Sequence, residues 1–200
     1  MIPALVLAAG KSTRMGRPKA MLPLAGGDTF LTRIVRTFLE ADIDDVVVVV
    51  GSDAAAIVDE FAASSLPARF IENTEFEQGQ LSSLLVGLRV VDRPGLAATL
   101  VTLVDVPFVA ASTVRAVVER YRRTHAPVVR PVRGTQHGHP VLIDRSLFDS
   151  IRAANPNQGA KEVVRAYASP AGDVEVDDEG AFADIDTPED YERVTAPRGS

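Results

Sequence analysis

The sequence lacks cysteine, long apolar runs and an excess of basic residues, and each absence excludes a class of protein. Without cysteine it can form neither disulfides nor thiolate metal sites, so a reducing cytoplasm is the expected location. No apolar run approaches the roughly 20 residues that span a bilayer, and Met1-Ile2-Pro3 lacks the charged start of a signal peptide, so we expect no membrane partner. A formal net charge of −6 argues against a nucleic-acid partner, because such binders usually carry a basic patch on a basic domain.

The length and composition are those of one enzyme-sized domain. The chain has 200 residues, of which 46% are hydrophobic, and a chain of this size buries about 70% of its unfolded surface. No internal repeat or low-complexity linker interrupts it. We therefore expect a single domain over residues 1–195 and a flexible tail over 196–200.

Short β-branched runs alternate with longer segments of helical period, which indicates an α/β domain with a largely parallel sheet. Strands are expected at 5–7, 46–50, 69–71 and 99–104, and five consecutive valines make 46–50 typical of a strand buried on both faces. Two helical faces are formed by Phe30, Ile34, Phe38 and Leu39, and by Leu81, Leu84, Leu85 and Leu88.

The second half of the chain is less regular. A helix is expected over 112–123, with Ser112 as its N-cap and a basic last turn that complements the helix dipole. Strands at 128–132 and 140–143, around a turn at Gly134, and a helix over 146–153 are then expected to cover the edge of the sheet.

The segment LVLAAGKSTRMGRPK, residues 5–19, leads from the first expected strand into a basic loop. Its GKST is the end of a phosphate-binding P-loop, but Leu5 stands where that motif needs its first glycine. The dinucleotide pattern fails as well, because the next glycine after Gly10 is Gly16. What remains is a glycine-bounded loop with the cations Lys11, Arg14, Arg17 and Lys19, which indicates another kind of phosphate site.

Carboxylates follow two other expected strands. The strand at 99–104 ends in Asp105-Val106-Pro107, and a late strand is expected to end in Asp184-Ile185-Asp186. In an open parallel sheet, ligands bind outside the carboxyl ends of the strands. Charge at the end of an apolar run needs solvent, a helix N-terminus or a cation, and Mg²⁺ is usually held by one or two carboxylates plus substrate phosphates.

Leu7-Ala8-Ala9-Gly10, followed by Arg14-Met15-Gly16 and Lys19, resembles the signature of the MobA-like nucleotidyltransferases. This family includes molybdenum cofactor cytidylyltransferase and guanylyltransferase. The resemblance continues nearly to the end of the chain, through GQLSSL at 79–84, VDVP at 104–107, GHP at 138–140 and DIDTPED at 184–190. It implies a Rossmann-like three-layer α/β/α domain of the nucleotide-diphospho-sugar transferase type, with a mostly parallel central sheet.

The resemblance also implies roles for the loop. Leu7, Ala8, Ala9 and Gly10 would bind the nucleotide by close backbone approach, Arg14 would face its β- and γ-phosphates, and Lys19 would face the reacting α-phosphate. Arg14, Lys19 and Asp105 would form the catalytic set. Lys11 and Arg17 are expected to be solvated.

The expected metal is Mg²⁺, bound by Asp105 with Asp186 as second ligand. Asp184 and Asp186 would share one face of an extended segment, so either can approach the metal. Thr187, Pro188 and Asp190 have a structural interpretation as the cap, first residue and capping-box partner of a helix.

Gln80, Ser82 and Ser83 have two interpretations. They precede an apolar helix face, so they can form its N-terminal cap; in the family, the same segment reaches the nucleobase, where a glutamine amide both donates and accepts hydrogen bonds. His139 is expected near the acceptor substrate, and His137 at the surface.

Ala9 stands where cytidylyl members of the family tend to carry alanine and guanylyl members glycine, so CTP is favoured over GTP. The leading hypothesis is an Mg²⁺-dependent enzyme that transfers CMP from CTP to molybdopterin and releases pyrophosphate, with a molybdoenzyme as a further partner. The alternatives are use of GTP, transfer to another acceptor such as a sugar or polyol phosphate, and a non-catalytic accessory protein that binds molybdenum cofactor.

Overall fold

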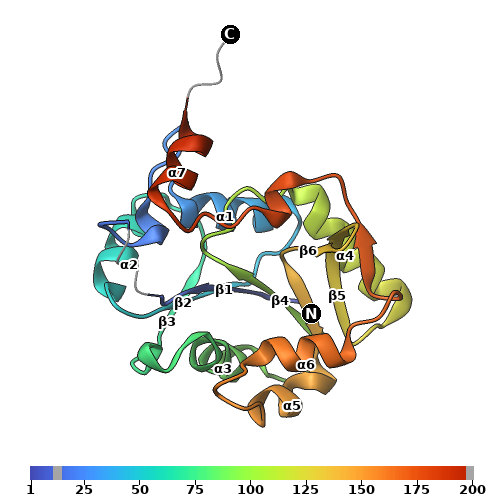
Figure 1. The fold of residues 1–200 in the computed structure, drawn as a ribbon. Helices are drawn as coiled ribbons and strands as arrows, with labels where there is room; N and C mark the ends of the chain where they lie inside the picture. The colour runs from blue at the N-terminus through green and yellow to red at the C-terminus, as the bar shows by residue number, and fades with distance from the viewer. Residues whose placement is uncertain (11–14, 197–200) are drawn as a thin grey trace.

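The computed structural model describes residues 1–10 and 15–196. A central sheet separates two layers of helices (Figure 1). Within the described residues the sheet has eight strands in the order β3-β2-β1-β4-β7-β5-β6, with β8 paired to β5. The strands are β1 (Ala4–Ala8), β2 (Val46–Val50), β3 (Arg69–Glu72), β4 (Ala98–Leu103), β5 (Val128–Arg133), β6 (Gln136–His137), β7 (Val141–Asp144) and β8 (Asp173–Glu175).

The helices are α1 (Phe30–Glu40), α2 (Ala54–Ala62), α3 (Gln80–Val91), α4 (Ala111–Thr124), α5 (Phe148–Arg152), α6 (Ala160–Tyr167) and α7 (Pro188–Thr195). Short 3₁₀ turns lie at Lys19–Met21, Phe76–Gln78, Arg145–Leu147 and Glu179–Phe182. Helices α1 and α4 cover one face of the sheet, and α3, α5 and α6 cover the other (Figure 1). None of the helices in the described ranges is long and apolar enough to cross a membrane.

The two faces of the sheet are sorted by the alternation of side chains along each strand. In β2, Val46, Val48 and Val50 join the core beneath α1 and α4, whereas Val47 and Val49 join the core above α3 and α5. Side chains in a strand point alternately to opposite faces, so an unbroken valine run needs cover on both sides. The expected three-layer arrangement and doubly buried strand are thus confirmed.

Strands β1, β2, β3 and β4 are parallel to one another, which places their carboxyl ends at one edge. The sheet continues through β7, which is antiparallel to both β4 and β5. The segments at 128–132 and 140–143, expected to cover the sheet edge, therefore extend the sheet itself. Where a helix was expected over 146–153, a 3₁₀ turn (Arg145–Leu147) leads into the short α5.

Two local expectations are wrong. The late strand expected to end in Asp184-Ile185-Asp186 does not form: a 3₁₀ turn precedes this segment, and within the described residues one backbone hydrogen bond, from Ile185 N to the Asp105 carbonyl oxygen at 2.9 Å, joins it to the end of β4. Ser112 does not cap α4, which begins one residue before it. Instead, Asp178 accepts hydrogen bonds from Ala110 N at 2.9 Å and Thr113 Oγ1 at 2.6 Å, so a distant carboxylate satisfies the helix start.

Candidate active site

The candidate active site lies where β1 and β4 end side by side. β1 leads into Ala9 and Gly10, and β4 leads through Val104 into Asp105. The hydrogen bond from Ile185 N to the Asp105 carbonyl oxygen brings the segment that carries Asp186 to the same place. Residues from three distant parts of the sequence therefore meet at the carboxyl edge, as the parallel topology requires.

Lys19 lies between the two carboxylates that were expected to bind metal. Its Nζ atom is 2.6 Å from Asp186 Oδ1 and 3.4 Å from Asp105 Oδ2. The Lys19 side chain is only 14% exposed, whereas that of Asp186 is 58% exposed. Asp186 therefore faces solvent, and Lys19 is largely surrounded by protein. The structure thus brings together the predicted residues Lys19, Asp105 and Asp186.

Asp105 is the carboxylate of this cluster whose pKa is shifted by its surroundings. Burial raises the pKa of its carboxyl, the charge of Lys19 opposes that rise, and the nearby Asp184 and Asp186 carboxylates add to it. Its Oδ1 atom is buried and has no hydrogen-bond partner among the described residues. A buried, partnerless carboxylate oxygen beside further acidic groups is a fitting ligand for a cation.

The donor set fits a metal that is completed by substrate. The residues described contain no group of three or more histidine, cysteine or carboxylate ligands that could enclose an ion. One or two carboxylates with phosphate oxygens are the usual environment of Mg²⁺. Of the two alternatives for the second ligand, Asp186 is the one that shares Lys19 with Asp105.

The loop before α7 is fixed by its own capping box. Thr187 Oγ1 accepts from Asp190 N at 3.1 Å, and Asp190 Oδ2 accepts from Thr187 N at 3.1 Å, which confirms the structural interpretation of this segment. Asp190 Oδ2 also accepts from Asp186 N at 3.3 Å. The cap therefore orients the backbone from which Asp186 reaches Lys19.

A cavity of about 410 Å³ opens beside this cluster. Among the predicted nucleotide residues it is lined by Leu7, Ala9, Gly10, Lys19, Gln80 and Ser83. Ala8 does not line it, because its side chain belongs to the core beneath α1 and α4. Sequence reasoning missed Phe76 and Glu77, although their place in the loop after β3, at the carboxyl edge of the sheet, could have indicated them.

The walls of this cavity at Ala9 and Gly10 differ in how tightly they are packed. Ala9 is 3% exposed, and a Cβ added to Gly51 would lie 2.9 Å from the Ala9 Cβ and 2.6 Å from its carbonyl oxygen. A Cβ at Gly10, in contrast, would meet no atom of the described residues within 4 Å. Gly51 is thus required for packing against Ala9, while Gly10 leaves its backbone open to a ligand.

The start of α3 is organised by a residue that sequence reasoning missed. No side chain caps α3; Gly79, with φ of 94°, precedes it, so the capping interpretation of Gln80, Ser82 and Ser83 is wrong. The buried Asn73 donates from Nδ2 to Ser82 Oγ at 2.8 Å and to Ser83 Oγ at 3.0 Å. Ser82 Oγ also donates to the Gly79 carbonyl oxygen at 2.8 Å, so Ser82 fixes the loop rather than lining the cavity.

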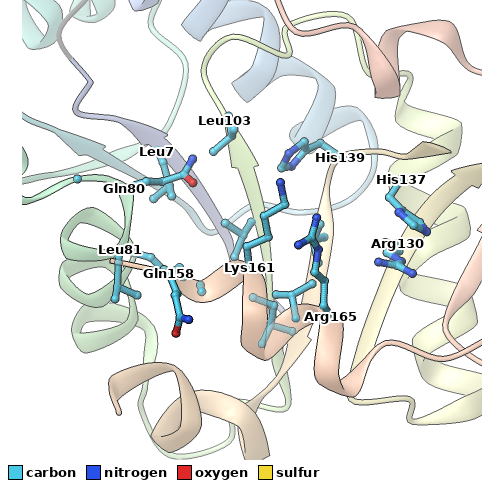
Figure 2. Close-up of a pocket in the computed structure, with 18 of the residues that line it drawn as sticks. Leu7, Gln80, Leu81, Leu103, Arg130, His137, His139, Gln158, Lys161 and Arg165 are labelled. Atoms are coloured by element: carbon cyan, nitrogen blue, oxygen red, sulfur yellow. The ribbon is translucent and has the colours of Figure 1, made fainter. Parts of the chain in front are cut away.

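His139, predicted near the acceptor, lines a second cavity of about 660 Å³ (Figure 2). The two cavities share Leu7, Gly79, Gln80 and Leu103, so they adjoin at the ends of β1 and β4. Burial lowers the pKa of His139, partly opposed by a hydrogen bond with the Val101 backbone, so the imidazole is neutral at pH 7. His137 is exposed, as expected, and also borders this cavity.

Two of the expected loop cations, Lys11 and Arg14, lie outside the described residues. Arg17 is within them, and its Nη2 atom is 3.3 Å from Glu60 Oε2 on α2. Its side chain is 43% exposed, which agrees with the expectation that it is solvated.

The MobA-like NTP transferase domain matches residues 4–171. The sequence is 29% identical over 206 residues to nicotine blue oxidoreductase of Paenarthrobacter nicotinovorans, with 96% of each chain covered. It is 30% identical over 151 residues to a probable molybdenum cofactor guanylyltransferase of Mycobacterium tuberculosis (strain ATCC 25618 / H37Rv), with 74% of this chain and 70% of the relative covered. The structure of Rv0371c from Mycobacterium tuberculosis H37Rv in complex with manganese is 28% identical, covers 97% of both chains and gives a TM-score of 0.76.

Proposed function

The chain belongs to the MobA-like NTP transferase domain family, and on this basis we propose that it transfers CMP from CTP to molybdopterin, with release of pyrophosphate. The observation that carries this proposal is the cluster of Lys19, Asp105 and Asp186. Lys19 and Asp105 line the smaller cavity, which adjoins the larger one at residues that line both. A nucleotide in the smaller cavity and an acceptor in the larger one would meet at that cluster.

In the proposed reaction, a phosphate oxygen of the acceptor attacks the α-phosphorus of the nucleotide. The new P–O bond forms as the bond to the β-phosphate breaks, and pyrophosphate leaves. With both substrates bound in adjoining cavities, the attacking oxygen and the α-phosphorus are held close together in the protein. Such positioning is a main contribution of a protein to phosphoryl transfer.

Lys19 supplies positive charge where charge develops. Its ammonium group is held between Asp105 and Asp186, and an incoming triphosphate offers it stronger acceptors than the exposed Asp186. Asp105 and Asp186, once released, would hold a divalent cation together with phosphate oxygens. When bound, that cation neutralises the charge of the triphosphate and of the leaving pyrophosphate.

The backbone at Gly10 and the side chain of His139 complete the proposed binding of the nucleotide and of the acceptor. The open face of Gly10 allows close approach of the nucleotide. The buried Nδ1 atom of His139 has no partner in the described ranges, and in a neutral imidazole that bonds through its other nitrogen it can accept a hydrogen bond from the acceptor.

The manganese complex of the similar protein Rv0371c supports a divalent cation in this fold. We propose Mg²⁺ for the present chain because the available ligands are carboxylates. For the base, we propose CTP because Ala9 carries a methyl group at the wall of the nucleotide cavity. GTP is a second candidate, since a relative that is 30% identical is named a guanylyltransferase.

The test is a pyrophosphate-release screen of CTP, GTP, ATP and UTP against molybdopterin, a sugar phosphate and a polyol phosphate, each with Mg²⁺ or Mn²⁺. We expect release with CTP and molybdopterin, and loss of release in Asp105→Asn. The matched control is Asp177→Asn, which removes the same charge at an exposed position outside both cavities. Release only with a different acceptor would replace molybdopterin, and no release with any pair would favour a non-catalytic accessory role.

A further inference from the structure

The larger cavity is lined by more basic side chains than the proposed reaction by itself requires. Its lining contains the basic side chains Arg130, Lys161 and Arg165 together with His137 and His139. Among the described residues it contains no carboxylate. The chain as a whole carries a net charge of −6, so the positive charge of this lining is opposite in sign to the net charge of the protein. A concentration of cations without acids indicates an anionic ligand.

Two of these cations project from one helix. Lys161 and Arg165 lie four residues apart on α6, which places them on the same face, and both side chains extend into the cavity (Figure 2). Within the described part of the chain neither has a salt-bridge partner within 4.0 Å. Arg130, from β5, is already paired with Asp173 at 2.9 Å. Lys161 and Arg165 are therefore the uncompensated charges of this cavity.

The floor between the cations and the reacting cluster is apolar. It is formed by side chains of α3, β7 and α6, namely Leu81, Leu84, Val141, Ile143 and Val164. The only buried polar atom without a partner beside this floor, among the residues described, is Nδ1 of His139. A polyhydroxylated ligand would leave the hydroxyl groups that rest on this floor unpaired, whereas a fused ring would cover it. The amide side chains of the lining, Gln78, Gln80, Asn157 and Gln158, are available to polar groups at the edge of such a ring.

We propose that this cavity selects an acceptor with two anionic ends separated by a flat, largely apolar body. This inference rests on the proposed function and deepens it. One end is the phosphate that reacts beside Lys19, and the other is a second anionic group that binds Lys161 and Arg165. A small sugar or polyol monophosphate would fill little of the 660 Å³ and would leave both α6 cations without a partner.

The test uses probes that cannot react. Naphthalene-1-sulfonate and naphthalene-1,5-disulfonate share one ring system and differ by a second permanent anion. The protein contains no tryptophan, so the emission of the probes can be followed directly during titration. The proteins compared are the wild type, the double variant Lys161→Gln/Arg165→Gln, and the charge control Arg122→Gln, an exposed residue of α4 outside the cavity.

We expect the wild type and Arg122→Gln to bind the disulfonate about fivefold to tenfold more tightly than the monosulfonate, a modest preference because the α6 side chains are exposed. The ratio should fall to about one in the double variant. Equal binding of both probes by the wild type, or an unchanged ratio in the double variant, would overturn the proposal.

The outcome of this experiment is independent of the proposed function, because probe binding needs neither CTP nor turnover. If the pyrophosphate screen were negative and the probe ratio held, the transfer reaction would be wrong and the charge selectivity of the cavity would stand. If release were observed and the ratio were one in the wild type, the acceptor would bind by its phosphate alone.

Discussion

Replacement of Asp105 by asparagine should separate catalysis from folding. The substitution keeps the shape of the side chain and removes one negative charge at the end of β4, where the carboxylate is partly buried and pairs with Lys19 at 3.4 Å. Lys19 keeps its shorter contact with Asp186 at 2.6 Å. The cluster should therefore retain its geometry while it loses a cation ligand.

The size of the loss follows from the charges involved. Two unit charges 4 Å apart interact by roughly 4 kcal/mol at the effective dielectric constant of a partly buried site. Loss of that amount from the transition state corresponds to a decrease in turnover of about 10³-fold. A divalent cation carries twice the charge, so 10³-fold is the lower bound we expect when Asp105 is a metal ligand.

Asp105→Asn should lower turnover without lowering the free energy of unfolding of the metal-free protein. Burial raises the folded-state pKa of Asp105 above the ordinary value of 3.8, so the folded protein favours the protonated form more than the unfolded chain does. The associated stability is present below pH 3.8 and is lost as the pH rises through the folded-state pKa. Asparagine cannot ionise, so Asp105→Asn should be as stable as the wild type at pH 7, or more stable.

The assays are pyrophosphate release at saturating Mg²⁺, Mn²⁺ binding followed by calorimetry, and urea denaturation without metal at pH 3.5 and pH 7. The control Asp177→Asn should change none of these. Near-normal turnover of Asp105→Asn at saturating Mg²⁺ would refute the assignment of Asp105 as a ligand. Unfolding of the variant at pH 7 would refute the electrostatic account of its burial.

Three further substitutions test other parts of the site and the fold. Lys19→Ala should lower kcat by more than it raises the KM for CTP, because charge at the reacting phosphate grows in the transition state, and a change confined to KM in steady-state kinetics would contradict that role. Ala9→Gly should lower the CTP:GTP ratio of kcat/KM by about tenfold, since one methyl group in a pocket is worth about 1–3 kcal/mol; an unchanged ratio would mean that the methyl group serves only to pack against Gly51. Asp178→Ala should destabilise the protein by about 1–2 kcal/mol in urea denaturation because α4 loses its cap, whereas the neighbouring Asp177→Ala should have little effect.

Features that depend on neighbours in the sequence could be predicted from the sequence. The valine run at 46–50 predicted a strand covered on both faces, and Thr187 and Asp190 predicted a capping box, because alternation and helix capping are local interactions. The loop at 5–19 indicated a phosphate site by its residues, and that site stays a prediction. The order of elements along the chain was enough to predict a largely parallel sheet, and the family resemblance added the three layers.

Only the tertiary structure decided which distant residues meet. Lys19 contacts Asp186 across 167 positions, Asp178 bonds to the start of α4 across 65, and α6 brings two cations to a cavity whose floor it shares with α3 and β7. Such contacts depend on how elements pack, and a side chain in a loop carries no local pattern that names its partner. The sequence by itself therefore determined most of the strands and helices and the kind of chemistry we expect, and packing determined the partners of Lys19, the hydrogen bonds at the start of α4 and the shape of the larger cavity.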